Sequence, residues 1–108
     1  MVRQPILWLL IFAFLLSSTA AAVHVPLGEV EIGSPLPDPF SCLTYQGRSS
    51  NSLALRAWGC EGKSDDWLIV PKAKPLKAPA GWFALEFQGE VLLFEPLDNG
   101  NIRVYLQR

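Results

Sequence analysis

Three short segments at the C-terminal end of this sequence are typical of strands, and the alternation of apolar and polar residues in the first and the third constrains the fold more than any other feature. The segments are Trp82 to Phe87, Glu90 to Glu95 and Ile102 to Gln107. A period of two is the pattern of a strand with one buried face. Gln88-Gly89 and Pro96 to Asn101 form the turns between them, and Asn99-Gly100 favours a hairpin because both residues tolerate positive φ. The sequence therefore predicts a C-terminal three-stranded meander.

The preceding chain carries further strand patterns between two proline-rich segments. The candidate strands are Val23 to Ile32, Phe40 to Gln46, Leu53 to Cys60 and Trp67 to Val70. The proline-rich segments, Gly33 to Phe40 and Pro71 to Gly81, favour extended connections that no helix can cross. No stretch has apolar residues at helical spacing for even ten residues or so. We therefore expect a small all-β domain with a trefoil-like, sandwich or barrel architecture.

The N-terminal segment has the three-part pattern of an export signal. Arg3 precedes an apolar run from Pro5 to Leu16, and small and polar residues lead to Ala20-x-Ala22 before Val23. The run is too short for a bilayer core that needs roughly 20 apolar residues. We therefore expect residues 1–22 to be a signal peptide and residues 23–108 to be a single domain. The mature protein is then secreted or periplasmic, without stable membrane insertion.

The chain has two cysteines, Cys42 and Cys60, which in an exported protein predict a disulfide. A hairpin that sets Cys42 directly opposite Cys60 would set Tyr45 opposite Ala57 and make the bond a cross-strand tie. The closed loop suggests roughly 3 kcal/mol of stabilisation. A metal site is not expected, since His24 is the single histidine and lies at the mature N-terminus.

The charges and the polar residues exclude several classes of function. Without Arg3, eight Lys and Arg oppose ten Asp and Glu, which is not the footprint of a nucleic-acid-binding protein. Neither a serine–histidine–acid set nor a free thiol nucleophile is available, so we expect no enzyme activity and no cofactor. Lys72, Lys74 and Lys77 form either a basic contact strip or part of a solvated connector, and the connector is the simpler interpretation.

One stretch resembles a repeat of the ricin-type β-trefoil lectins. It opens with Cys42-Leu43, continues to Trp58-Gly59-Cys60 where the family has Trp-x-Cys, and ends with Asp65-Asp66-Trp67 where the family has Gln-x-Trp. The resemblance implies that Trp58 is a platform for a sugar ring and that Trp67 belongs to the core. Trp67 also begins an apolar run, continued by Leu68 to Val70, that suggests burial on both faces.

The match covers only residues 42 to 67, and it departs from the family at important positions. Thr44 stands where sugar-binding repeats carry an acid, and Arg56 stands where they carry a polar partner of the tryptophan. The chain also has no room for the three repeats of a trefoil. We accordingly take Trp58, Arg56, Asp65 and Thr44 as the candidate ligand-binding residues, with the alternative that Trp58 merely covers the disulfide.

These observations predict a non-catalytic binding module for a glycan or a protein surface. Trp58, Trp67 and Trp82 give a small domain an aromatic surplus, and tryptophan is a favoured anchor at interfaces. The alternative is a small periplasmic inhibitor or an accessory subunit of an exported protein complex. Both alternatives need an exposed recognition surface rather than a catalytic cleft.

Overall fold

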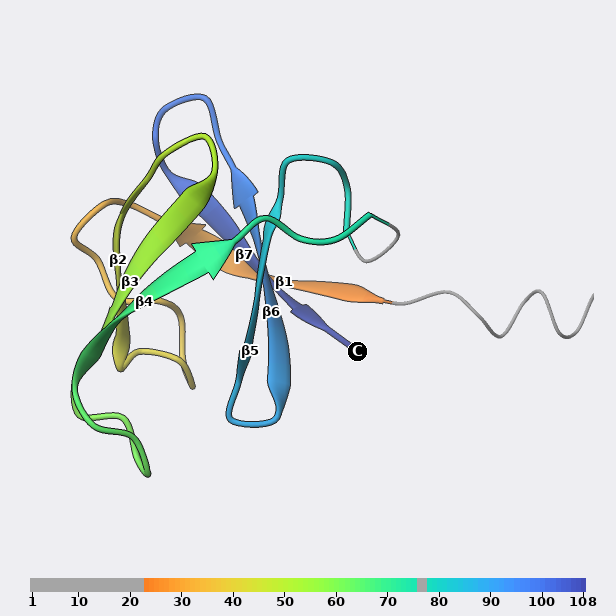
Figure 1. The fold of residues 1–108 in the computed structure, drawn as a ribbon. Coiled ribbons are helices and arrows are strands. Elements are labelled where there is room, and N and C mark those ends of the chain that lie inside the picture. Colours follow the sequence, from red (N-terminus) through yellow and green to blue (C-terminus); the bar gives the residue numbers. More distant parts are fainter. Residues whose placement is uncertain (1–22, 76–77) are drawn as a thin grey trace, which may run out of the picture.

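The computed structural model describes residues 23–75 and 78–108, and the predicted signal peptide lies outside the described residues (Figure 1). The described chain forms seven strands and no helix. The strands are β1 (His24–Val30), β2 (Leu43–Arg48), β3 (Ser52–Ala57), β4 (Asp66–Pro71), β5 (Phe83–Phe87), β6 (Glu90–Pro96) and β7 (Ile102–Gln107). The all-β prediction is confirmed.

β1, β7, β6 and β5 form a four-stranded antiparallel sheet in that order. The predicted C-terminal meander, β5-β6-β7, is therefore confirmed. Gln88 and Gly89 both have positive φ, at 51° and 79°, and join β5 to β6 in the two-residue turn that suits the twist of a hairpin. The β6–β7 connection is longer: only Gly100 takes a positive φ there, and the Leu97 N–H donates to the Asn101 carbonyl.

β2, β3 and β4 form a three-stranded antiparallel sheet. The β2–β3 hairpin is present, but its predicted register is wrong by two residues, because Tyr45 lies opposite Leu55 instead of Ala57. The register shifts again between Tyr45 and Gly47, where β2 has one residue more than its partner. Leu53, Leu55 and Ala57 point inward on β3, as their spacing predicts.

The two sheets are connected at both edges by residues that the sequence analysis placed in linkers. The segment from Gly33 to Leu36, which follows β1, runs antiparallel to β2, with the Leu36 N–H donating to the Leu43 carbonyl at 2.8 Å. At the other edge Lys72, just after β4, bridges to Phe83 at the start of β5. The result is a sandwich whose sheets are joined at both edges, as in a barrel.

The space between the sheets contains one apolar core. Its largest fully buried side chains come from both sheets and from the proline-rich connection: Leu36, Leu43, Tyr45, Leu53, Leu55, Phe83, Leu92, Phe94 and Ile102. Burial of Leu36 and Phe40 explains why the segment between β1 and β2 follows a fixed path despite its prolines. The alternate residues of every strand are therefore left on the outer faces.

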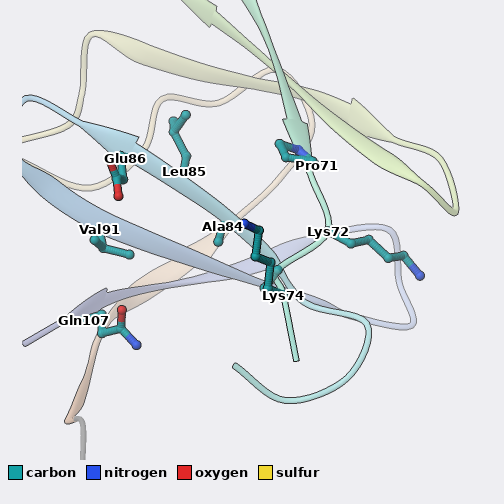
Figure 2. Close-up of a pocket in the computed structure, with 9 residues that line it drawn as sticks. Pro71, Lys72, Lys74, Ala84, Leu85, Glu86, Val91 and Gln107 are labelled. Carbon is teal, nitrogen blue, oxygen red and sulfur yellow. The ribbon is translucent and has the colours of Figure 1, made fainter. Parts of the chain in front are cut away.

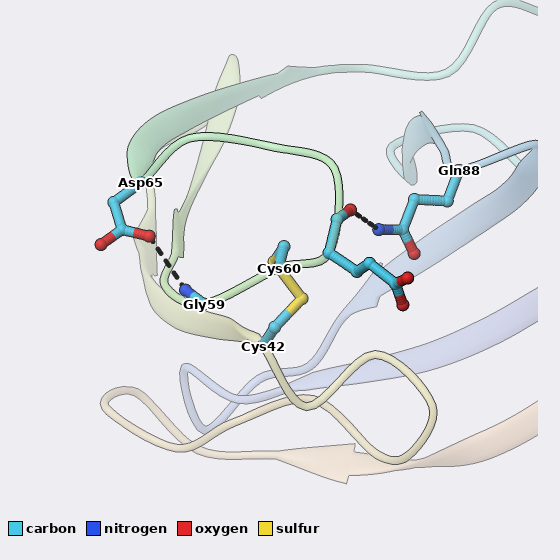
Figure 3. Close-up of a disulfide and its surroundings, with 6 residues drawn as sticks. Cys42, Gly59, Cys60, Asp65 and Gln88 are labelled. Carbon is cyan, nitrogen blue, oxygen red and sulfur yellow. Dashed lines mark hydrogen bonds between the residues drawn. A yellow bond between two sulfur atoms is a disulfide. The ribbon is translucent and has the colours of Figure 1, made fainter.

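The Cys42–Cys60 disulfide is present, with Cα atoms 5.2 Å apart (Figure 3). It lies beyond the ends of the paired strands rather than across them, because Cys42 is level with Trp58, whose N–H donates to the Cys42 carbonyl at 2.9 Å. Gly59, with φ at 70°, turns the chain so that Cys60 returns over Cys42. A disulfide of this kind is typical of proteins that fold in an oxidising compartment.

Candidate functional site

The outer face of the β2-β3-β4 sheet carries three large apolar side chains that are open to solvent. Trp58 is 66% exposed, Trp67 50% and Ile69 66%. Trp67 and Ile69 are two residues apart on β4 and share a face, while Arg56, on β3, and Trp58, the residue just after β3, have the same spacing. We call Arg56, Trp58, Trp67 and Ile69 the tryptophan face. Exposed apolar residues gathered in this way mark an interaction surface more often than scattered ones do.

Arg56 contacts both indoles. Its guanidinium carbon is 5.6 Å from the Trp58 ring centroid and 5.3 Å from the Trp67 ring centroid. Strand register explains the second contact, since Arg56 is directly opposite Trp67 in the β3–β4 pair. Both distances are within the roughly 6 Å range of a cation–π contact. These contacts restrict the orientations of both rings and of the Arg56 side chain.

The other two predicted site residues border this face. Thr44, half-buried on β2, is directly opposite Arg56. Asp65 is exposed and accepts a hydrogen bond from the Gly59 N–H at 2.9 Å through Oδ1 (Figure 3). The structure thus brings Arg56 together with Thr44 and Trp58, while Asp65 is placed to hold the turn that follows Trp58.

Trp67 is where the sequence analysis was wrong. It was expected in the core, yet half of it is exposed, while Val70 from the same run is fully buried. The run from Trp67 to Val70 is apolar at every position, so composition alone suggests burial on both faces. Strand alternation sends Trp67 and Ile69 outward instead, because no further layer covers the outside of this sheet in the described chain. Their shared spacing was the available signal.

The loop from Gly59 to Asp65, which follows Trp58, is held at several points (Figure 3). The disulfide ties its start to Cys42, and the Gln88 side chain reaches from the β5–β6 turn to donate to the Glu61 carbonyl at 2.9 Å. The backbone of Trp58 is therefore next to a segment with covalent and hydrogen-bonded supports, and its ring contacts Arg56. An anchored aromatic side chain loses little conformational freedom when a ligand binds.

A second candidate site is a hollow of about 260 Å³ beside β5 and β6 (Figure 2). Its floor includes Ala84 and Val91, and Lys74, Glu86 and Gln107 lie at its border. Lys72 points away from that floor in Figure 2. Ligand pockets usually enclose about 300–1,000 Å³, and the volume of this hollow lies below that range. Lys77, the third residue of the predicted basic strip, lies outside the described residues.

The outer face of the four-stranded sheet carries a polar network whose groups satisfy one another. Arg103 contacts Glu95 at 3.2 Å and Glu29 at 3.9 Å. Hydrogen bonds from the Asn101 and Asn99 amides, with the nearby Arg103 charge, lower the pKa of Glu29. This cluster connects β1 to β7 and to the turn before it, which is a structural role. It contrasts with the tryptophan face, whose arginine contacts aromatic rings instead of carboxylates.

The comparisons with family models, with curated proteins and with solved structures find no match to this chain. Across residues 23–75 and 78–108 there is no group of three or more histidine, cysteine, aspartate or glutamate side chains placed to hold a metal ion. The same residues contain no helix long and apolar enough to cross a membrane. The function is therefore argued from the site alone.

Proposed function

We propose that this chain is an exported, non-catalytic binding module that recognises its ligand with the tryptophan face. The observation that carries the proposal is the pair of exposed indoles that both contact Arg56. Tryptophan and arginine are the residues most enriched among those that dominate binding energy. The exposed parts of the two indoles add little stability to the isolated fold, whereas a ligand that covers them releases water from their surface.

Export is the second part of the proposal, and the disulfide supports it. Cleavage between Ala22 and Val23 would leave all seven strands intact, because β1 begins at His24. Mass spectrometry of the chain recovered from the envelope or the medium tests this: we expect a mature N-terminus at Val23. Recovery of an unprocessed chain in the reducing cytosol would contradict it.

The sequence left a glycan and a protein surface as the two ligand classes, and both would use this face. A sugar ring stacks on an exposed indole such as Trp58, and the ricin-type resemblance favours that ligand. A protein partner would cover Trp58, Trp67 and Ile69 together, which corresponds to the inhibitor or accessory-subunit alternative. The first experiment therefore tests whether the tryptophan face is the binding surface, whichever of the two ligand classes binds there.

That experiment screens the full chain, expressed with its own N-terminal segment, against a glycan array and against displayed peptides. The same screens use the Trp58→Ala/Trp67→Ala double variant and, as a control, Arg103→Gln on the opposite sheet. We expect every ligand bound by the wild type to be lost by the double variant and kept by the control. Ligands that bind the double variant as well as the wild type would place recognition elsewhere and refute the proposal.

A further inference from the structure

Arg56 differs from the arginine on the opposite sheet in what surrounds its charge. Arg103 has two carboxylate neighbours, Glu95 and Glu29. For Arg56, the contacts recorded in the described part of the chain are with the Trp58 and Trp67 rings, and no ion pair is among them. Asp65 and Asp66 are close in sequence, but each has an oxygen bound to a backbone N–H, at Gly59 and at Trp67.

The contacts that hold Arg56 leave its hydrogen-bonding groups available. A guanidinium is planar and carries five N–H donors in its plane, and within the described residues no hydrogen bond or ion pair of the Arg56 side chain occupies them. These donors match the two oxygens of a carboxylate, which then forms a bidentate pair stronger than a neutral hydrogen bond. Because two rings already restrict the side chain, binding such a group costs less conformational entropy than at a free arginine.

The surroundings of the guanidinium favour a polypeptide over a sugar. Ile69 extends the apolar surface beyond Trp67 and is as exposed as Trp58. An acidic sugar would bring hydroxyl groups against this aliphatic surface, where they would lose water without gaining hydrogen bonds. Apolar side chains of a protein partner would instead gain from covering it.

We propose that the tryptophan face binds a protein partner through one carboxylate side chain of that partner, flanked by apolar side chains. The carboxylate pairs with Arg56, and the flanking side chains cover Trp58 on one side and Trp67 with Ile69 on the other. Asp65 and Asp66 oppose a partner segment that carries several negative charges at this point. The inference rests on the proposed function, because it names the partner class for the same face.

The test selects a random peptide library, displayed on phage, against the full chain, and remakes the enriched sequences as synthetic peptides. We expect enriched sequences to carry one Asp or Glu between aromatic or aliphatic residues. Replacing that acid by its amide should weaken binding at least about tenfold, as should Arg56→Gln. Arg56→Lys keeps the charge but loses the planar fork, so it should recover only part of the affinity. Arg103→Gln, which removes an equal charge from the other sheet, should bind like the wild type.

Oligogalacturonate and cello-oligosaccharide, an acidic and a neutral sugar, are titrated in parallel. Enriched peptides without an acid, or full binding by Arg56→Gln, would overturn the inference. Binding of a sugar at the tryptophan face, with no peptide bound there, would also overturn the inference. The proposal that the chain is a binding module would remain valid in that case. If neither peptides nor sugars lose affinity in the Trp58→Ala/Trp67→Ala variant, the inference and the proposed function fail together. Circular dichroism of each variant confirms that a lost interaction does not come from unfolding.

Discussion

Single side chains on this domain have sharply different surroundings although they come from the same apolar runs. Trp67 and Ile69 face solvent while Val70 is fully buried, because a strand at the surface of a sandwich turns every second residue outward. An apolar residue in a strand is therefore not by itself a core residue. The exposed ones are available for binding, and their removal should affect recognition more than folding.

Thermal melts of alanine variants test this division. Trp58→Ala and Trp67→Ala each remove an exposed ring and a cation–π contact, so each should cost about 1 kcal/mol or less. Phe94→Ala, which removes a fully buried ring from β6, should cost about 3–5 kcal/mol. A Trp67→Ala protein that melts as low as Phe94→Ala would show that Trp67 supports the core after all.

Tyr45 combines a buried ring with a hydroxyl that donates to the Gly100 carbonyl at 3.0 Å. Burial raises its pKa above the ordinary value, with Arg48 opposing the shift. The folded state thus favours the neutral phenol, and this stabilisation is present below about pH 10 and is lost as the pH rises through the folded-state pKa.

Tyr45→Phe tests both roles of the hydroxyl. At pH 7 the variant should be less stable by about 1 kcal/mol, the value of one hydrogen bond. Above pH 10 the difference should shrink, because Tyr45 ionises in the unfolded wild type while its buried phenol resists ionisation in the folded state, and the variant has no such group. Urea melts at pH 7 and at pH values above 10 measure it, and a difference that stays constant across this range would contradict the assignment.

At the scale of strands and turns, much of the fold was predictable from local pattern. The meander followed from alternation in β5 and β7 and from the turn residues on both sides of β6, and the inward face of β3 followed from Leu53, Leu55 and Ala57. The β2–β3 register did not, because it depends on the extra residue near Gly47 and on the turn at Gly59, and neither has a unique sequence signature. The pairing of Gly33 to Leu36 with β2 was not predicted, because proline lacks an N–H and argues against a paired strand. The residues between the prolines keep their N–H groups and form the hydrogen bonds with β2.

The candidate site was predictable only in part, for the same reason. Arg56, Trp58 and Thr44 could be placed together because they lie on a predicted hairpin. Trp67 could not be assigned to the same surface without knowing that β4 pairs with β3 and that no layer covers them outside. Alternation within one strand shows which residues share a face, but it does not show which strands are neighbours. A surface formed by two strands can therefore be assigned only when their pairing is known.

The β5–β6 turn offers an element-scale prediction, because both of its residues have positive φ. A Cβ at Gly89 would meet no atom within 4 Å, so Gly89→Ala tests backbone conformation alone. We expect a loss of about 1 kcal/mol in the free energy of unfolding. Gly89→Asn should cost less, since asparagine tolerates this conformation better than alanine does. Equal losses in urea melts would mean that the backbone is not what requires glycine here.

For the whole molecule, the main question is what makes so short a chain hold two sheets together. A domain of about 86 residues buries a modest core and has only a small net stability. The Gly33-to-Leu36 pairing and the Lys72–Phe83 bridge close the edges between the sheets, but each involves few residues. The disulfide joins Cys42, just before β2, to the loop that follows Trp58, and this makes it a support for both the fold and the tryptophan face.

The double variant Cys42→Ser/Cys60→Ser tests that support without leaving a lone thiol. The bond closes a loop with a sequence separation of 18, for which chain entropy gives about 3 kcal/mol of stabilisation. The variant should therefore melt well below the wild type, and reductant should lower the wild type to the same temperature while leaving the variant unchanged. At a temperature where the double variant is still folded, the loop after Trp58 has lost its covalent tie to Cys42. Its affinity for the selected peptides should therefore fall further below that of the wild type than the affinity of Gly89→Ala does. Gly89→Ala is the control because it is expected to lose less stability. Wild-type melts that are identical with and without reductant would show that the bond contributes nothing to the fold.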